Sequence, residues 1–463
     1  MTAGTFTLLV LALYVLLLQR LNRRNFIVSP VGIHIAYLAM YVVVPAVLLY
    51  NSGLSHEEGS YGIVIQERCL EILDLAIISM GIGAGLAGAK YRFSTRSFER
   101  LKRLRDDLSG PVQRARVKLT LIFASVITAI FFYTNREFLS FLSSPAALLR
   151  HYFFIQTFKT DIEFGANYLL QGVHQLFPIM SVVFLAKWYM SHKPLYRNLA
   201  ILIICIDVVC LSLYGAVWVA FSGVVMLLLM RQYFRPLTRK DLVWVAPGLV
   251  IMIVGSVAYK HGYVSVEGLD YDAFQSIAGD VLGSRFSSGA AQLQFVIQMF
   301  PTHLPHMFGL GFLHDLIAMI PSPIKRSIFP ETYWVGFDGY MYYLMFGAYG
   351  GSAQIPVMGE FYCEFGSLGV IVGSIAYGYF IQRLSNLFAA RRFKSLTGVA
   401  FGVILGYRFA EATVEGLGGR LMVSAAWIVI LYFFFSPTKA TSPIRQECAG
   451  GALPLNPPKI DGL

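Results

Sequence analysis

The sequence predicts an all-α protein that crosses a membrane about eleven times. Of its 463 residues, 56% are hydrophobic and only 14% are charged, and the mean hydropathy is +0.61. Apolar runs of about 16 to 24 residues recur along the chain, and each is long enough to cross a hydrocarbon core of about 30 Å as a helix. Because lipid cannot satisfy exposed backbone N–H and C=O groups, such runs must be helical.

The apolar runs define the expected order of spans. Residues 1–259 carry the first eight and 357–436 the last three, with a large outer loop at 260–356 between them and a disordered cytoplasmic tail at 437–463. The first run has no signal-peptide features and is interpreted as a retained helix. The expected spans are 4–19, 28–50, 69–89, 118–134, 168–187, 199–214, 215–230, 242–259, 357–381, 396–414 and 420–436.

The basic residues are distributed unevenly between the two sides of the predicted membrane. If the N-terminus is outside, 27 of the 37 Lys and Arg residues fall in cytoplasmic segments or at their helix ends. The positive-inside rule predicts this asymmetry, so we expect a multi-pass protein of a bacterial inner membrane. The net charge of +11 does not form one patch, which argues against nucleic acid as a partner.

The segment 260–356 is too long for a simple connector and is expected to be structured and functional. Leu313, Leu316, Ile317 and Ile320 have the spacing of a short amphipathic helix, which Pro321 and Pro323 should end. A second outer loop is expected at about 135–167.

Cations are rare on the predicted outer side, so each needs an explanation. A guanidinium forms paired, charge-assisted hydrogen bonds with phosphate, and near lipid a lipid-linked pyrophosphate is the obvious ligand. Contact with lipid headgroups or a salt bridge within a loop is the alternative for any one of them. Arg285 is the strongest candidate because it precedes an expected helix at 290–300. The cations on the two long outer loops are Arg136, Arg150, Lys159, Arg285, Lys325 and Arg326.

Aromatic side chains are dense at 331–349, including Trp334 and Tyr340. Such rings suit sugar faces, but they also form the aromatic belt of membrane proteins. Asp270 and Asp272 are a weak match to a metal-binding pair, and helix capping is the simpler interpretation. The five cysteines have no zinc or redox spacing. Neither a metal nor another cofactor is therefore predicted.

Acidic residues within predicted spans are costly and are usually paired or functional. Arg408 and Glu411 are three residues apart and are expected to pair within one helix. Glu360 and Glu364 enter another helix at i and i+4, where the large loop returns to the membrane. Glu360 has no basic neighbour on its own helix.

The junction Gly359-Glu360-Phe361-Tyr362-Cys363-Glu364-Phe365-Gly366 resembles that of the O-antigen polymerases, the Wzy-type oligosaccharide repeat-unit polymerases. Upstream, Arg285 in Ser-Arg-Phe, the run Phe308-Gly309-Leu310-Gly311, and Ile320-Pro321 resemble the long periplasmic loop of that family in order and spacing. The resemblance covers about 283–380 and implies a GT-C-like fold.

The resemblance implies transfer of a glycan from undecaprenyl pyrophosphate to another lipid-linked repeat unit, without a nucleotide sugar or metal. The partners would be these lipid-linked oligosaccharides, membrane lipids and a chain-length regulator protein. Such a reaction needs a base for the attacking hydroxyl and positive charge for the departing pyrophosphate. Glu360 is the expected base, and Arg285, with Arg326 or Arg150, the expected charge.

Other functions remain open from the sequence. An O-antigen ligase would use the same donor, with a loop histidine, His303, His306 or His314, as the base. A flippase or other transporter would explain the intramembrane acids but not one long asymmetric outer loop. A purely structural membrane subunit is a third alternative.

Overall fold

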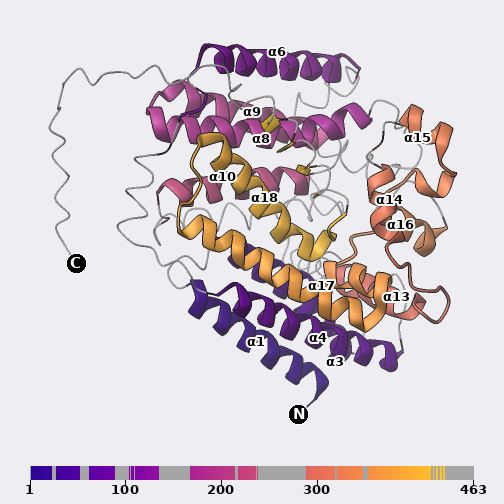
Figure 1. Ribbon diagram of the computed structural model, residues 1–463. Helices are drawn as coiled ribbons and strands as arrows, with labels where there is room; N and C mark the ends of the chain where they lie inside the picture. The colour runs from indigo at the N-terminus through magenta and orange to yellow at the C-terminus, as the bar shows by residue number, and fades with distance from the viewer. Residues whose placement is uncertain are drawn as a thin grey trace, which may run out of the picture.

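The structure is a computed structural model of the whole chain, in which helices dominate (Figure 1). The residues it describes are 2–22, 28–52, 62–88, 104, 106–108, 110–134, 167–213, 217–235, 237, 288–318, 320, 322–347, 353–418, 421, 424–425, 428–429 and 431–432. No strand occurs in these described parts, in agreement with the predicted all-α class.

The amino-terminal part consists of long helices at the predicted apolar runs. They are α1 (Ala3–Asn22), α2 (Pro30–Tyr37), a π-helical turn η2 (Leu38–Val43), α3 (Val44–Ser52), α4 (Ile63–Ala87), α6 (Pro111–Thr134), α8 (Asn167–Ser191), α9 (Pro194–Leu213) and α10 (Val217–Phe234). The expected span at 242–259 lies outside the described residues. Helix α6 begins at Pro111, within the segment expected as a basic cytoplasmic loop.

The carboxy-terminal part starts with short helices and ends with two long ones. The short ones are α13 (Ser288–Met299), α14 (Leu310–Ala318), α15 (Ser322–Ile328), a 3-10 turn η6 (Glu331–Tyr333) and α16 (Phe337–Phe346), and the long ones are α17 (Val357–Ala389) and α18 (Leu396–Glu415). The predicted helix at 290–300 corresponds to α13. The amphipathic helix predicted around 313–320 corresponds to α14, which ends at Ala318, while Pro323 belongs to the first turn of α15.

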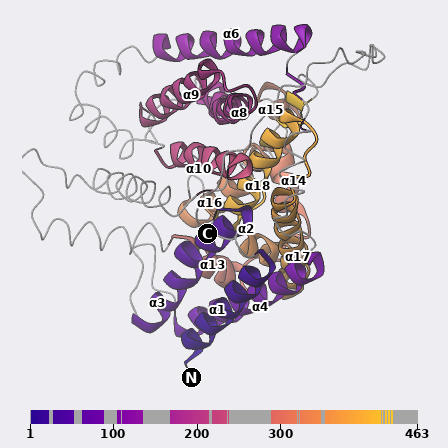
Figure 2. The same ribbon diagram turned by 90° about the vertical axis from the view of Figure 1, so that its left-hand side faces the viewer.

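Four helical segments of the described chain are long and apolar enough to cross a membrane: Ala3–Asn22, Pro30–Asn51, Ile63–Ala87 and Val357–Ala389. Helices α1, α4 and α17 lie side by side (Figures 1 and 2). Glycines allow α4 and α17 to approach closely: a Cβ on Gly83 would lie 2.0 Å from the Ile375 carbonyl oxygen, and one on Gly378 would lie 2.2 Å from that of Met80. Small residues have this role in membrane helix pairs because backbones must meet directly.

Polar contacts join the helix ends that the charge pattern assigns to the cytoplasm. The contacts are an ion pair between Lys187 and Asp106, a bond from the Thr397 N–H to Asp107 Oδ1 (3.2 Å), one from Arg391 Nε to the Tyr233 carbonyl (2.7 Å), and one from Asn386 Nδ2 to the Gly88 carbonyl (2.7 Å). Segments far apart in the sequence therefore meet at one end of the bundle. Helices α14 to α16 gather away from it (Figure 1).

Two hydrogen-bonded networks lie in the interior of the bundle. The predicted Arg408–Glu411 pair is confirmed, and Glu411 Oε1 also accepts a bond from Tyr407 (3.0 Å). In the second network, His34 bonds Tyr14 through Nε2 (3.0 Å) and Thr413 through Nδ1 (2.7 Å). Buried polar groups that are satisfied in this way specify which helices pack together.

Candidate functional site

Helix α17 is broken eight residues after its start. Phe365 (φ −141°, ψ 20°) and Gly366 (φ 62°, ψ −150°) leave the helical conformation, and the positive φ at Gly366 is one that glycine adopts without strain. The break removes intrahelical partners from the preceding carbonyl groups. Those of Cys363 and Glu364 instead accept hydrogen bonds from the N–H groups of Met307 (2.9 Å) and Phe308 (3.0 Å). The loop before α14 thus satisfies the backbone that the break exposes.

The carboxylate of Glu364 caps the amino end of α14. Its Oε2 accepts a hydrogen bond from the Gly309 N–H, and its Oε1 accepts one from the Phe312 N–H at 3.3 Å. A negative charge is stabilised there because the first N–H groups of a helix have no intrahelical partner. A Cβ on Gly311 would lie 2.3 Å from Glu364 Oε1, so the helix can approach the carboxylate only because this residue is glycine.

Glu360 lies one turn earlier, with 3% of its surface exposed. Its Oε2 accepts a bond from the Leu417 N–H (2.6 Å), and its Oε1 accepts one from the Gly418 N–H (3.4 Å). The turn after α18 is shaped around this carboxylate: Gly416 has φ +74°, and a Cβ there would lie 2.1 Å from Glu360 Oε1. As folded, the expected base holds a turn of the backbone.

Asp315 of α14 meets the same turn from the other side. Its Oδ1 accepts a bond from the Phe337 N–H (2.9 Å) at the start of α16, and a Cβ on Gly418 would collide with its Oδ2. Burial raises the pKa of Asp315 to about 6; the hydrogen bond from Phe337 opposes this effect and the charge of Glu364 adds to it. Three carboxylates, Asp315, Glu360 and Glu364, therefore converge where α14, α17 and the 416–418 turn meet.

His314 and Tyr340, both predicted site residues, lie together beside these carboxylates. The His314 ring is stacked between Tyr333, at a centroid distance of 4.4 Å, and Tyr340, at 4.8 Å. It is 4% exposed, and burial lowers its pKa, with a backbone hydrogen bond at Val335 acting in the opposite direction. Burial therefore favours the neutral imidazole, and within the described residues its Nδ1 has no hydrogen-bond partner.

Lys325 and Arg326 of α15 form a second group with Trp334, which follows η6. Lys325 is buried and donates to the carbonyl groups of Trp334 (2.6 Å) and Ala318 (3.4 Å), and burial lowers its pKa. The Arg326 guanidinium is 5.2 Å from the centroid of the Trp334 ring and lies on the exposed side of α15. Lys325 is thus engaged by the fold, whereas Arg326 can reach an external anion.

The remaining predicted site residues, Arg285, Arg136 and Arg150, lie outside the described residues, as do Asp270 and Asp272. The structure adds Asp315 and the 416–418 turn, which the sequence analysis did not single out. The only signal for that turn was the run Gly416-Leu417-Gly418-Gly419 directly after an apolar span. In the described part of the chain, no group of three or more His, Cys, Asp or Glu residues could hold a metal ion.

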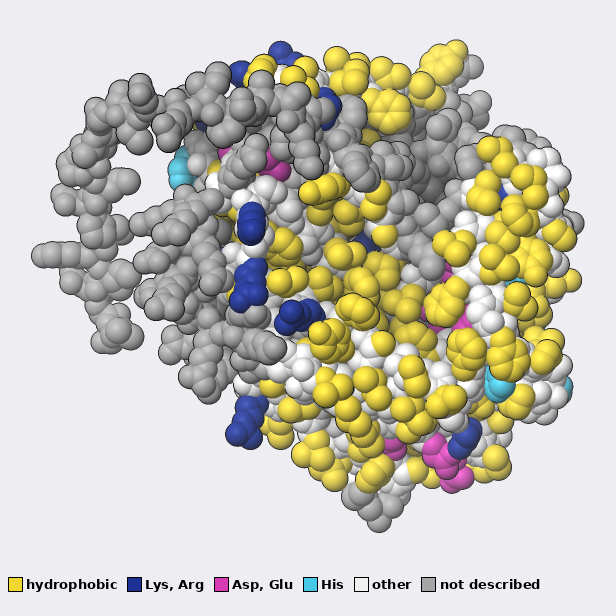
Figure 3. All heavy atoms as spheres, in the orientation of Figure 1, with side chains coloured by type: hydrophobic (Ala, Val, Ile, Leu, Met, Phe, Trp, Pro, Cys, Tyr) yellow, Lys and Arg dark blue, Asp and Glu magenta, His cyan; other side chains and the backbone are white. Residues whose placement is uncertain are grey.

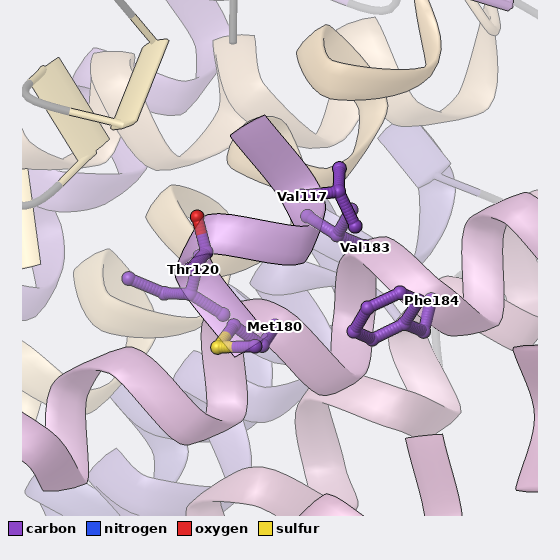
Figure 4. A pocket seen from close by; sticks show the side chains of 6 residues that line it. Val117, Thr120, Met180, Val183 and Phe184 are labelled. Carbon is purple, nitrogen blue, oxygen red and sulfur yellow. The ribbon is translucent and has the colours of Figure 1, made fainter. Parts of the chain in front are cut away.

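An apolar pocket lies between α6 and α8, and none of its lining residues belongs to the carboxylate cluster (Figure 4). It is lined by Val117, Thr120, Ile179, Met180, Val183 and Phe184. The hydroxyl group of Thr120, which lines the pocket, donates a hydrogen bond to the Arg116 carbonyl (2.9 Å). Since its lining has no ionisable group, it offers no acid, base or charge for catalysis.

Fold and site together define an all-α membrane protein with a cluster of buried carboxylates and aromatic rings beside a broken helix. Comparisons with models of protein families, with curated proteins and with solved structures find no match to this chain.

Proposed function

We propose that this chain polymerises undecaprenyl-pyrophosphate-linked oligosaccharide repeat units at the periplasmic face of a bacterial inner membrane, as a multi-pass protein with about eleven spans and a GT-C-like fold. One observation carries the proposal. The two motifs that resemble the polymerases, Phe308-Gly309-Leu310-Gly311 and Gly359 to Gly366, are in direct contact through Glu364 and the carbonyl groups of the α17 break. Residues that are fifty positions apart thus contribute to one cluster.

The proposed reaction needs a group that receives the proton of the attacking hydroxyl. Glu360 is the first candidate, and it would have to leave the N–H groups of Leu417 and Gly418 to act as a base. His314 is the second, because burial lowers its pKa and its Nδ1 has no partner in the described residues. Tyr340 and Trp334 would bind sugar rings through their faces.

The proposed reaction also needs positive charge at the departing pyrophosphate. Arg285 is assigned this role, with the exposed Arg326 to assist it and Arg136 and Arg150 as supporting charges. Lys325 is buried against the carbonyl groups of Ala318 and Trp334 and would support this region without touching the pyrophosphate. A guanidinium suits this group because its paired donors match phosphate oxygens, whereas lysine supplies only the charge.

The test is the glycan profile of a deletion strain complemented with variants. Deletion should leave single repeat units in place of a ladder, and Arg285→Ala should fail to restore it. Removal of a donor to a developing anion, as in the alanine variant, costs roughly 10²- to 10³-fold in rate. Arg285→Lys should restore the ladder in part, because lysine keeps the charge and loses only the paired donors. Arg197→Ala is the control, since this exposed arginine donates hydrogen bonds only to its neighbour Asn198 within the described part of the chain.

Other profiles would contradict the proposal. Lipid A core without any attached glycan in the deletion strain would indicate a ligase or a flippase instead. A full ladder from a well-expressed Arg285→Ala variant would remove this residue from the reaction.

A further inference from the structure

Helix α14 has its polar side chains inside and its apolar side chains outside. His314 and Asp315 are buried, whereas Leu310, Leu313 and Leu316 are exposed. These leucines are three residues apart and so lie along one side of the helix. A helix bordering water has the opposite arrangement, so the medium around α14 must differ from water.

The apolar surface continues onto the neighbouring segments. Phe308, directly before α14, is 70% exposed, and Ile324 and Ile328 of α15 are exposed by 51% and 65%. Figure 3 shows hydrophobic side chains covering much of the face over α14 and α15. We call these six residues, Phe308, Leu310, Leu313, Leu316, Ile324 and Ile328, the outward apolar face.

This face joins the outer side of a membrane-spanning helix. The ring of Phe308 lies 6.0 Å from that of Phe365, and Phe365 starts a row of exposed apolar residues on α17 that continues with Leu368 and Val372. Because α17 is long and apolar enough to cross a membrane, its exposed apolar row has the composition of a lipid-facing side. Two backbone hydrogen bonds, from Met307 and Phe308 to the α17 break, hold the rings at this boundary.

The charges are also placed as at a membrane interface. In the described side chains of α14 and α15, Arg326 is the one exposed ionisable group, and it lies against Trp334. Arginine and tryptophan favour the headgroup level, where the ring is partly buried and the guanidinium contacts phosphate.

We propose that the outward apolar face is embedded in the acyl chains of the outer leaflet, so that α14 and α15 lie in the membrane surface. This places the carboxylate cluster, on the inner side of α14, at the depth of the lipid headgroups. The inference is independent of the proposed transferase activity, since it concerns where α14 and α15 lie relative to the membrane and not which reaction the protein catalyses.

The test is the accessibility of spin labels on the full chain. The protein, with Cys205, Cys210 and Cys448 replaced by serine, is reconstituted in phosphatidylethanolamine and phosphatidylglycerol vesicles without polyprenyl phosphate. Labels at Leu313→Cys and Leu316→Cys are compared with a lipid reference at Leu368→Cys and a water reference at Lys193→Cys, with a water-soluble nickel complex present on both sides. Leu368 and Lys193 are both exposed.

We expect both α14 labels to resemble that at Leu368, with high accessibility to oxygen and low accessibility to the nickel complex. Nickel accessibility like that at Lys193 would overturn the proposal, because the face would then border water. Low accessibility to both reagents would overturn it too, since a second copy or another protein would then cover the face. Each labelled variant should elute as the parent does, which establishes that it is folded.

Discussion

Glu364, on membrane helix α17, caps the first turn of α14, where its Oε1 accepts the hydrogen bond from the Phe312 N–H across 52 residues of sequence. Glu364 lies one helical turn after Glu360 on α17, and its backbone carbonyl group accepts a hydrogen bond from the Phe308 N–H. One residue therefore links the break in the membrane helix to the helices that cover it.

We expect Glu364→Gln to destabilise the protein by about 1 kcal/mol, because the amide keeps an acceptor but loses the charge that favours a helix amino end. Glu364→Ala should cost about 1–3 kcal/mol, since it leaves buried N–H groups without a partner. Thermal unfolding in detergent measures both. Glu71→Gln, on an exposed glutamate of α4, is the matched control. Equal unfolding temperatures for Glu364→Ala and the control would show that the cap contributes nothing.

Gly416→Ala should disturb the turn that holds Glu360. The alanine would be strained at φ +74°, and its Cβ would lie 2.1 Å from Glu360 Oε1, so we expect a loss of about 1–3 kcal/mol. Gly85→Ala is the control, because a Cβ at Gly85 of α4 would meet nothing within 4 Å. The two variants are compared by thermal unfolding at equal expression. If Gly416→Ala unfolds with the parent, the turn has another conformation in the membrane.

Asp315 should make stability fall as pH rises. Its pKa is raised from 3.8 to about 6, mainly by burial, so the folded state binds the proton more tightly than the unfolded state. The resulting stabilisation is fully present below about pH 4 and is lost as the pH passes 6, with a total of about 3 kcal/mol. Asp315→Asn, which keeps an acceptor for the Phe337 N–H, should remove this slope between pH 4 and 7. An unchanged slope in thermal unfolding scans would assign it to another group.

The predicted orientation can be measured with two exposed positions. Thr302 lies in the turn after α13, and Lys193 lies in the turn between α8 and α9. The charge asymmetry places the first outside and the second in the cytoplasm. In intact cells, a membrane-impermeant thiol reagent should therefore label Thr302→Cys, and should label Lys193→Cys only after permeabilisation. The reverse pattern would invert the whole topology.

Much of the helical framework could be predicted from the sequence, because an apolar run in lipid has no alternative to helix. The presence of helices at α13 and α14, though not their first residues, and the Arg408–Glu411 pair could be predicted from patterns within one segment. Such features depend on neighbours three or four residues apart, which the sequence displays directly.

Only the tertiary structure decided how these elements meet. Hydropathy treats 357–381 as one continuous span, whereas the break at Phe365 and Gly366 exists because the 306–308 loop supplies N–H groups to the freed carbonyls. The outward orientation of Leu313 and Leu316 was likewise hidden, since periodicity identifies an apolar side of a helix but not the medium it borders. Contacts between residues about fifty positions apart depend on how all the helices pack together. No single segment of the sequence displays them.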